Sequence, residues 1–215
     1  MMRHYGLKLF LFVLVAAQAV CLGMDEAADR VIRNVEKRIS SAKTMRVEFV
    51  ESYFWELTGE EQSLEGVLIL EDETRFRVTT EDQIIVSDGD TLWTYSIPSK
   101  RVLIDKLVKT DDALLPRQIF FRYTHDYRAQ SRGEETIDGK VCHVIDLTSE
   151  SDDVFIPRAV VWVDGKTWLP VKVAQTDLNG NQTIYLLHEI AIDVPVDAGL
   201  FRFDIPPDTE VIRMQ

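Results

Sequence analysis

The side chains that most often carry catalysis or bind metal ions are few in this sequence and lie far apart. The histidines are His4, His125, His143 and His188, and the cysteines are Cys21 and Cys142. Neither His143 nor His188 has a metal-ligand set or a triad partner at a recognised spacing. The two cysteines have neither metal spacing nor the pattern of a disulfide framework, so Cys142 is interpreted as a small core residue. These residues predict no metal site.

Hydroxyl and carboxylate groups offer no better catalytic arrangement. Ser87-Asp88 lacks the Gly-x-Ser-x-Gly pattern of a nucleophile elbow and lies between two predicted strands. The pairs Asp111-Asp112 and Asp152-Asp153 fit solvated caps and loops better than acid/base or calcium sites. There is no glycine-rich phosphate loop. We therefore expect that the protein is not an enzyme, has no catalytic residues and uses no cofactor. The alternative is a hydrolase whose Ser, His and Asp side chains come together only in the folded chain.

The charge balance excludes one class of partner. The formal net charge is −12, and it becomes −14 without residues 1–23, which contribute Arg3 and Lys8 and no acid. A product this acidic, without a basic stripe, is not expected to bind phosphate backbones. No nucleic-acid partner is predicted.

The first 23 residues have the pattern of a secretory signal peptide. Basic residues precede the apolar run from Leu9 to Ala17, which is too short to span a bilayer. Cleavage after Ala19 and cleavage after Gly23 both fit. A lipoprotein signal centred on Cys21 fits poorly, because Val20 and Gln18 are not the small and aliphatic residues it needs. We expect an exported, soluble product with residues 1–23 as signal peptide and 24–215 as one domain.

Hydrophobic periodicity predicts a helix followed by strands. From Asp25 to Lys43 the apolar residues recur at three- and four-residue steps, which is typical of an amphipathic helix. From Met45 to Leu57 the period changes to two, which is typical of a long half-buried strand. Its apolar side consists of Met45, Val47, Phe49, Tyr53, Trp55 and Leu57. Glu51 interrupts that side.

The rest of the chain alternates short strand patterns with turn signals. Turns of Asp-Gly or Asn-Gly type occur at Asp88-Gly89, Asp138-Gly139, Asp164-Gly165 and Asn179-Gly180. Such spacing predicts neighbouring antiparallel strands and no βαβ crossover. The segment Ala113 to Phe121 is a second helical candidate, either a core helix or a plug for an opening. The predicted fold is mainly β (α+β), with one large curved antiparallel sheet and few helices.

Two motifs give the sequence a family resemblance. The run IVSDGDTLWTY, from Ile85 to Tyr95, resembles the SDGxxLWxY hairpin of periplasmic outer-membrane lipoprotein carrier proteins, the LolA-like family. The ending LFRFDIPPDTEVI resembles the end of the same family. Similarity continues through MRVEF, through Gly66 at the start of GVLIL, and through DGKTWLPVKVAQTDLNGNQTIYLLHEI.

The resemblance implies a fold, a function and partners. It implies an unclosed β-barrel (half-barrel) with an N-terminal helix and a short helical lid. It also implies a monomeric periplasmic carrier that takes acylated lipoproteins from an inner-membrane ABC transporter to an outer-membrane receptor or the outer membrane itself. The alternative is a periplasmic sensor of lipids or lipoproteins on the same half-barrel, without transport. Such relatives usually carry a second domain, whereas this sequence ends soon after the FRFDIPP segment. We therefore expect the carrier and not the sensor.

The resemblance and the strand alternation together predict the site residues. Because a half-barrel of this kind turns its apolar side inward, the strands should present apolar side chains to an acyl-chain cavity. The predicted cavity residues are Phe49, Leu68, Leu70, Phe76, Val78, Ile85, Trp93 and Tyr95. The predicted lid residues are Leu114, Leu115, Ile119 and Phe120. One departure concerns the lid: well-studied relatives hold it with an Arg-Pro pair, which Asp72-Glu73 replace here.

Overall fold

The computed structural model describes residues 26–72, 74–107, 127–151 and 154–214. The predicted lid residues Leu114, Leu115, Ile119 and Phe120 lie outside the described residues, so their role stays a prediction. Within the described residues no helix is long and apolar enough to cross a membrane.

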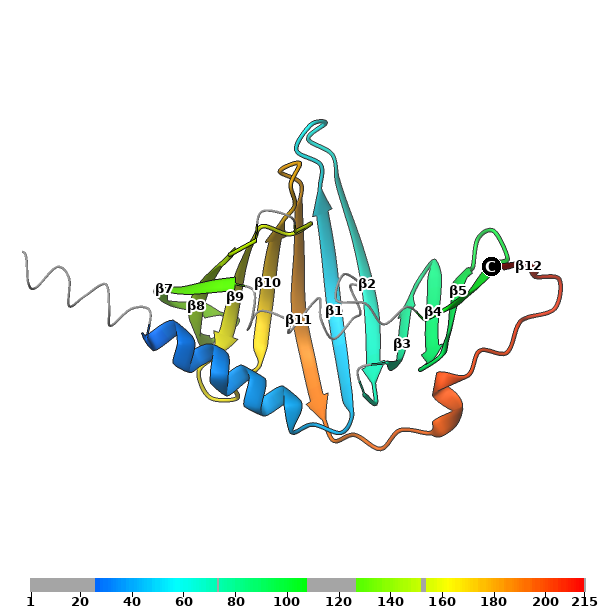
Figure 1. Cartoon of the computed structure of the whole chain (residues 1–215), viewed down its shortest axis with the longest axis horizontal. Coiled ribbons are helices and arrows are strands. Elements are labelled where there is room, and N and C mark those ends of the chain that lie inside the picture. Colours follow the sequence, from blue (N-terminus) through cyan, green and yellow to red (C-terminus); the bar gives the residue numbers. More distant parts are fainter. Residues whose placement is uncertain (1–25, 73, 108–126, 152–153, 215) are drawn as a thin grey trace, which may run out of the picture.

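One curved sheet dominates the structure (Figure 1). In the described ranges it has twelve strands: β1 Met45–Phe54, β2 Glu61–Leu70, β3 Arg75–Thr80, β4 Gln83–Asp88, β5 Thr91–Ser96, β6 Arg101–Lys106, β7 Tyr127–Ile137, β8 Lys140–Ser149, β9 Arg158–Asp164, β10 Pro170–Thr176, β11 Gln182–Ile192 and β12 Glu210–Arg213. Their order is β12-β6-β5-β4-β3-β2-β1-β11-β10-β9-β8-β7. All neighbours are antiparallel except β12 and β6, which are parallel. The prediction of a large unclosed antiparallel sheet is confirmed.

The sheet consists of two runs of hairpins joined at the first strand. β1 to β6 follow one another as neighbours, and so do β7 to β11. β11 then returns to pair with β1 from Met45↔Ile192 to Phe54↔Gln182, with a β-bulge between Glu48 and Phe49. β1 is therefore the centre of the sheet, with β2 on one side and β11 on the other.

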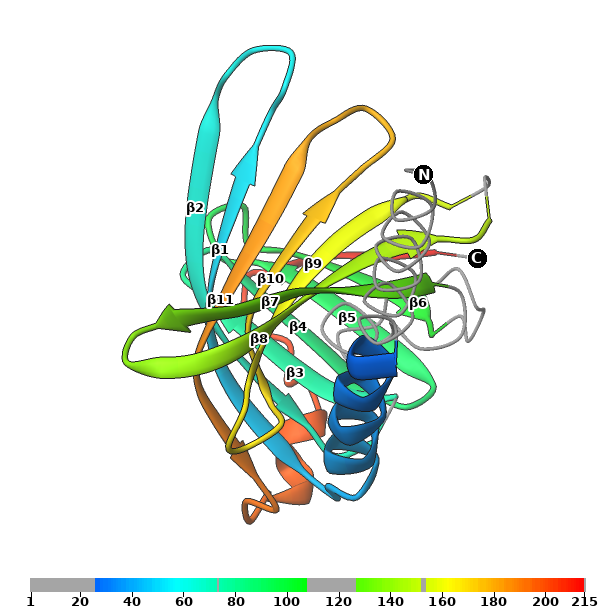
Figure 2. The same cartoon turned by 90° about the vertical axis from the view of Figure 1, so that its left-hand side faces the viewer.

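The N-terminal helix, residues 26–40, covers part of the inner side of the curve (Figure 2). Its buried residues are the ones that the periodicity predicts, namely Ala28, Val31, Ile32, Val35 and Ile39, each 8% exposed or less. They belong to the same apolar cluster as the inward side chains of the strands. The helix is stabilised by this packing, because a lone helix of its length is marginal in water.

The C-terminal segment covers the opposite face of the sheet. The 3-10 helix η1, Ala198–Phe201, contacts β3 and β4. Arg77, on β3, donates from Nη1 to the carbonyl of Leu200 at 3.4 Å. Phe201 is only 2% exposed, and Phe203 packs on Tyr95 with ring centroids 5.4 Å apart. The convex side of β3 to β5 therefore has an apolar core of its own.

This second core predicts the effect of one substitution. Phe201→Ala should lower the free energy of unfolding by about 3 kcal/mol, because it leaves a cavity between η1 and the sheet. Phe155→Ala is a control of the same chemistry at a side chain that is 60% exposed, and it should change stability by less than about 0.5 kcal/mol. Chemical unfolding of both variants measures the difference. Equal, small effects would mean that the C-terminal segment only rests on the sheet.

Candidate functional site

The concave face of the sheet carries most of the residues that the sequence predicts for the cavity. Leu68, Leu70, Phe76 and Phe49 are between 0% and 6% exposed and belong to one apolar cluster. Val78 and Ile85 are partly buried against that cluster. Strand register explains the grouping, since Val47, Leu68, Val78 and Ile85 are successive partners across β1 to β4. These side chains therefore form one continuous apolar surface.

Trp93 and Tyr95 lie on the convex face of the sheet, whereas the sequence analysis predicts them in the cavity on the concave face. Trp93 pairs with Val86 and Tyr95 pairs with Ile84, whereas Ile85 pairs with Thr94. Because side chains alternate along a strand, Ile85 and Trp93 cannot share a face in this register. Tyr95 instead packs against Phe203 beneath the C-terminal segment. Their predicted placement in the cavity is corrected on these grounds.

The structure adds residues to the concave face that the sequence analysis missed. Leu92, partner of Ser87, is an inward apolar residue of β5. On the other half of the sheet the inward residues include Ile145, Val161, Val173, Tyr185 and Leu187, each at most 8% exposed. Their alternation is readable in the sequence. The face on which they lie is not, because that depends on the return of β11 to β1.

A glycine lets one of the cavity residues lie flat on the sheet. Gly66 is the cross-strand partner of Phe49. A methyl group at Gly66 would lie 2.5 Å from Cζ of Phe49 and 3.1 Å from Cγ2 of Thr80. The ring therefore occupies the space of the missing side chain, which gives a physical reason for Gly66 in the motif GVLIL.

Gly66→Ala should move the Phe49 ring and lower the free energy of unfolding by about 1 to 3 kcal/mol, because it overpacks the face. Gly165→Ala is the control, since its added methyl meets only ordinary contacts at 3.4 Å. Adding Phe49→Leu to Gly66→Ala should recover part of the loss, because the smaller side chain frees the space. Thermal and chemical unfolding of the single and double variants measure this coupling. Additive losses would contradict it.

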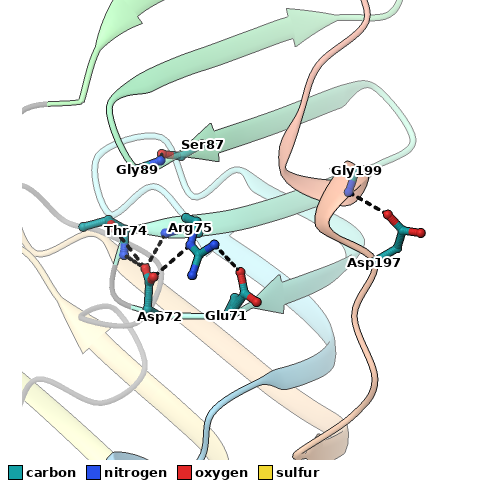
Figure 3. A network of polar contacts seen from close by, with 8 residues as sticks. All are labelled: Glu71, Asp72, Thr74, Arg75, Ser87, Gly89, Asp197 and Gly199. Atoms are coloured by element: carbon teal, nitrogen blue, oxygen red, sulfur yellow. Dashed lines mark hydrogen bonds and ion pairs between the residues drawn. The ribbon is translucent and has the colours of Figure 1, made fainter.

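A polar network occupies the turn between β2 and β3, around Asp72 (Figure 3). Oδ1 of Asp72 accepts from the backbone nitrogens of Thr74 and Arg75, both at 2.7 Å. Oδ2 of Asp72 accepts from Nε of Arg75 at 3.0 Å. Nη1 of Arg75 also lies 2.8 Å from Oε2 of Glu71, as an ion pair rather than an aligned hydrogen bond. The guanidinium of Arg75 is thus held by two carboxylates of its own turn.

The network lowers the pKa of Asp72. Burial by itself raises this pKa, but the hydrogen bonds from Arg75 and Thr74 outweigh burial and bring it to about 2 from 3.8. Because the folded-state pKa is the lower one, the resulting stabilisation is complete above about pH 4 and is lost as the pH falls towards 2.

Asp72→Asn should therefore lower the free energy of unfolding at pH 7, by no more than about 1 kcal/mol because the group is largely solvated. The difference from the parent should shrink between about pH 4 and pH 2. Urea unfolding at a series of pH values measures it. A difference that does not change with pH would show that the substitution acts through packing and not through charge.

Glu51 brings a carboxyl group to the concave face on β1. It aligns with Leu64 on β2 and with Tyr185 on β11, and the row continues through Val173, Val161 and Ile145. Burial raises the pKa of this carboxyl above its ordinary value. The described part of the chain offers no hydrogen bond or ion pair to the carboxylate. Glu51 lines a cavity of about 290 Å³ together with Tyr53, Trp55, Gln62 and Leu64.

No group of three or more His, Cys, Asp or Glu side chains in the described ranges could hold a metal ion. Cys142 is fully buried, and burial raises the pKa of its thiol. Around the cavity at Glu51, the described residues therefore give the concave face the chemistry of an apolar surface next to a carboxyl group.

Comparison with known proteins places this geometry in a family. A family model described as outer membrane lipoprotein carrier protein LolA matches residues 40–204. Over 219 residues the chain is 24% identical to an outer-membrane lipoprotein carrier protein of Azotobacter vinelandii, covering 96% of this chain and 100% of that protein. It is 22% identical over 214 residues to an uncharacterised protein of Methanocaldococcus jannaschii, covering 96% of this chain and 60% of that relative's length.

Solved structures share the fold. An uncharacterised conserved protein from Thermus thermophilus superposes with a TM-score of 0.57 at 14% identity, covering 87% of this chain and 99% of that chain. At this identity the likeness bears on architecture alone.

Proposed function

Because this chain belongs to the LolA family of outer membrane lipoprotein carrier proteins, we propose that it binds the acyl chains of lipoproteins on its concave face and carries them through the periplasm. The donor would be an inner-membrane ABC transporter, and the acceptor an outer-membrane receptor or the outer membrane. In this role the protein is a chaperone and carrier rather than an enzyme. It needs no cofactor.

One observation carries the proposal: a continuous apolar surface lines the inside of a sheet that does not close. Val78, Ile85 and Leu92 are only partly buried there, as are Leu64, Ile190 and Ile192. A bound acyl chain would bury what remains exposed of these side chains. The six predicted residues Phe49, Leu68, Leu70, Phe76, Val78 and Ile85 form the part of this surface that we propose as the binding site.

The energy of such binding is large enough for a carrier. A chain of about fifteen methylenes gains on the order of 12 kcal/mol on leaving water, at roughly 0.8 kcal/mol per methylene. Release then requires something that replaces the lost contacts, either an acceptor surface or apolar residues of the protein itself. Leu114, Leu115, Ile119 and Phe120 are the residues predicted for that second role.

Two neighbouring isoleucines of β4 allow a matched test of the binding face. Ile85 faces the apolar cluster, and Ile84 pairs with Tyr95 on the opposite face. Ile85→Glu should weaken binding of an acylated peptide at least about tenfold, because it places a charge against the acyl chains. Ile84→Glu adds the same charge and should leave binding nearly unchanged. Equal effects in the two variants, at equal thermal stability, would contradict binding on the concave face.

The cargo and the transport step need separate measurements. Native mass spectrometry of the protein purified from its own periplasm should show a bound acylated polypeptide. Incubation with donor vesicles that hold a labelled lipoprotein, followed by acceptor vesicles, should then move the label. Binding without transfer would favour the sensor, and the absence of any acylated species would contradict both functions.

A further inference from the structure

At the β1–β2 hairpin, which forms the outer end of the concave face, the inward side chains include a carboxyl group and aromatic rings. On β1 the inward side chains continue from Phe49 through Glu51 and Tyr53, and Trp55 follows directly after the strand. The rings of Tyr53 and Trp55 meet edge to face with centroids 4.4 Å apart. With Glu51 and with Gln62 and Leu64 of β2 they line the open cavity of about 290 Å³. This volume is at the lower end for ligand pockets, so it suits one small group and not a whole lipid.

The lining of this cavity, which we call the Glu51 pocket, favours a positive charge. A carboxylate that loses water without gaining a partner is unfavourable, and a cation in the pocket would restore the balance. The faces of aromatic rings also attract cations. The protein already contains one such contact on its other face, where Nζ of Lys172 lies 4.4 Å from the centroid of the Trp162 ring.

The surrounding hairpin strengthens this preference. Residues 51–66 contain Glu51, Glu56, Glu60, Glu61 and Glu65 and no Lys, Arg or His. The neighbouring hairpin from 173 to 187 adds Asp177 and also lacks basic residues. An anionic group brought to this end of the sheet would be repelled, whereas a cation would be attracted.

The Glu51 pocket is continuous with the proposed acyl-chain surface. Leu64 lines the pocket and also packs against the apolar cluster, and Tyr185, the partner of Glu51 on β11, belongs to that cluster. A cargo whose acyl chains lie on the concave face can therefore place its polar end in the pocket.

We propose that the Glu51 pocket binds the ammonium or guanidinium group of a basic residue close to the acylated end of the cargo polypeptide, with Glu51 as its counter-ion and Trp55 and Tyr53 against its stem. The inference rests on the proposed function and adds a preference among lipoproteins to it. An ethanolamine phospholipid offers the same ammonium group. Its phosphate, however, would lie among the carboxylates of the hairpin, which disfavours it as the occupant.

Two synthetic lipopeptides test the preference. Both carry a triacylated cysteine, followed in one by two lysines and in the other by two glutamines. Competition against an apolar fluorescent dye should show the lysine peptide binding the parent protein about tenfold more tightly at low salt. The preference should shrink as ionic strength rises. Equal affinities would overturn the inference and leave the proposed function intact, whereas no binding of either peptide would overturn both.

Variants locate the preference. Glu51→Gln should reduce the affinity ratio to near one while leaving the affinity for the glutamine peptide unchanged, and Trp55→Leu should reduce it in part. Glu65→Gln removes the same charge from the opposite face of the hairpin, where Glu65 pairs with Val50, and should lower the ratio much less than Glu51→Gln does. A ratio that survives Glu51→Gln, or that Glu65→Gln lowers equally, would mean general charge attraction and would overturn the site.

A lipid comparison tests the source of the cation. Lysophosphatidylethanolamine and lysophosphatidylglycerol with the same acyl chain are titrated into the parent and Glu51→Gln proteins. We expect no difference between the two lipids that depends on Glu51. Such a difference, together with equal binding of the two lipopeptides, would assign the pocket to a lipid headgroup and overturn the polypeptide assignment.

Discussion

An apolar face on a sheet that does not close has to be covered by something other than the sheet. The described part of this protein solves the problem only in part. The N-terminal helix covers a portion of the concave side, and the C-terminal segment covers the convex side of β3 to β5. Val78, Ile85 and Leu92 remain half-covered within the curve. The proposed function rests on this deficit, since a bound acyl chain would cover such a surface.

Much of the fold could be predicted from local pattern. The helix periodicity predicts the buried residues of helix 26–40, and alternation predicts the inward residues of β1 to β4, because both depend only on the geometry of one element. Trp93 and Tyr95 show where such reasoning fails. The loop between Ser87 and Leu92 has an even number of residues, so Ile85 and Trp93 fall on opposite faces. That parity can be read from the sequence. The aromatic character of Trp93 and Tyr95 is what led to their wrong placement in the cavity.

Other features were beyond local pattern because they depend on contacts between distant segments. The parallel pairing of β12 with β6, and the path of the C-terminal segment over the convex face, leave no periodic signal. The Glu51 pocket could be predicted only in part from local pattern. The interruption at Glu51 is visible in the alternation, but its meaning requires Leu64 and Tyr185 from two other strands. A polar residue that breaks an apolar row is therefore informative only once its cross-strand neighbours are known.

The central position of β1 has a consequence for how the chain reaches this structure. One edge of β1 pairs with β2, which follows it directly in the chain. The other edge pairs with β11, so that Met45 lies opposite Ile192. Closure of so long a loop makes this pairing slow compared with the local hairpins. While the chain is incomplete, the middle strand of the future sheet is an open edge that another chain could join. The centre of this sheet is therefore open to pairing with another chain until β11, near the end of the sequence, is present.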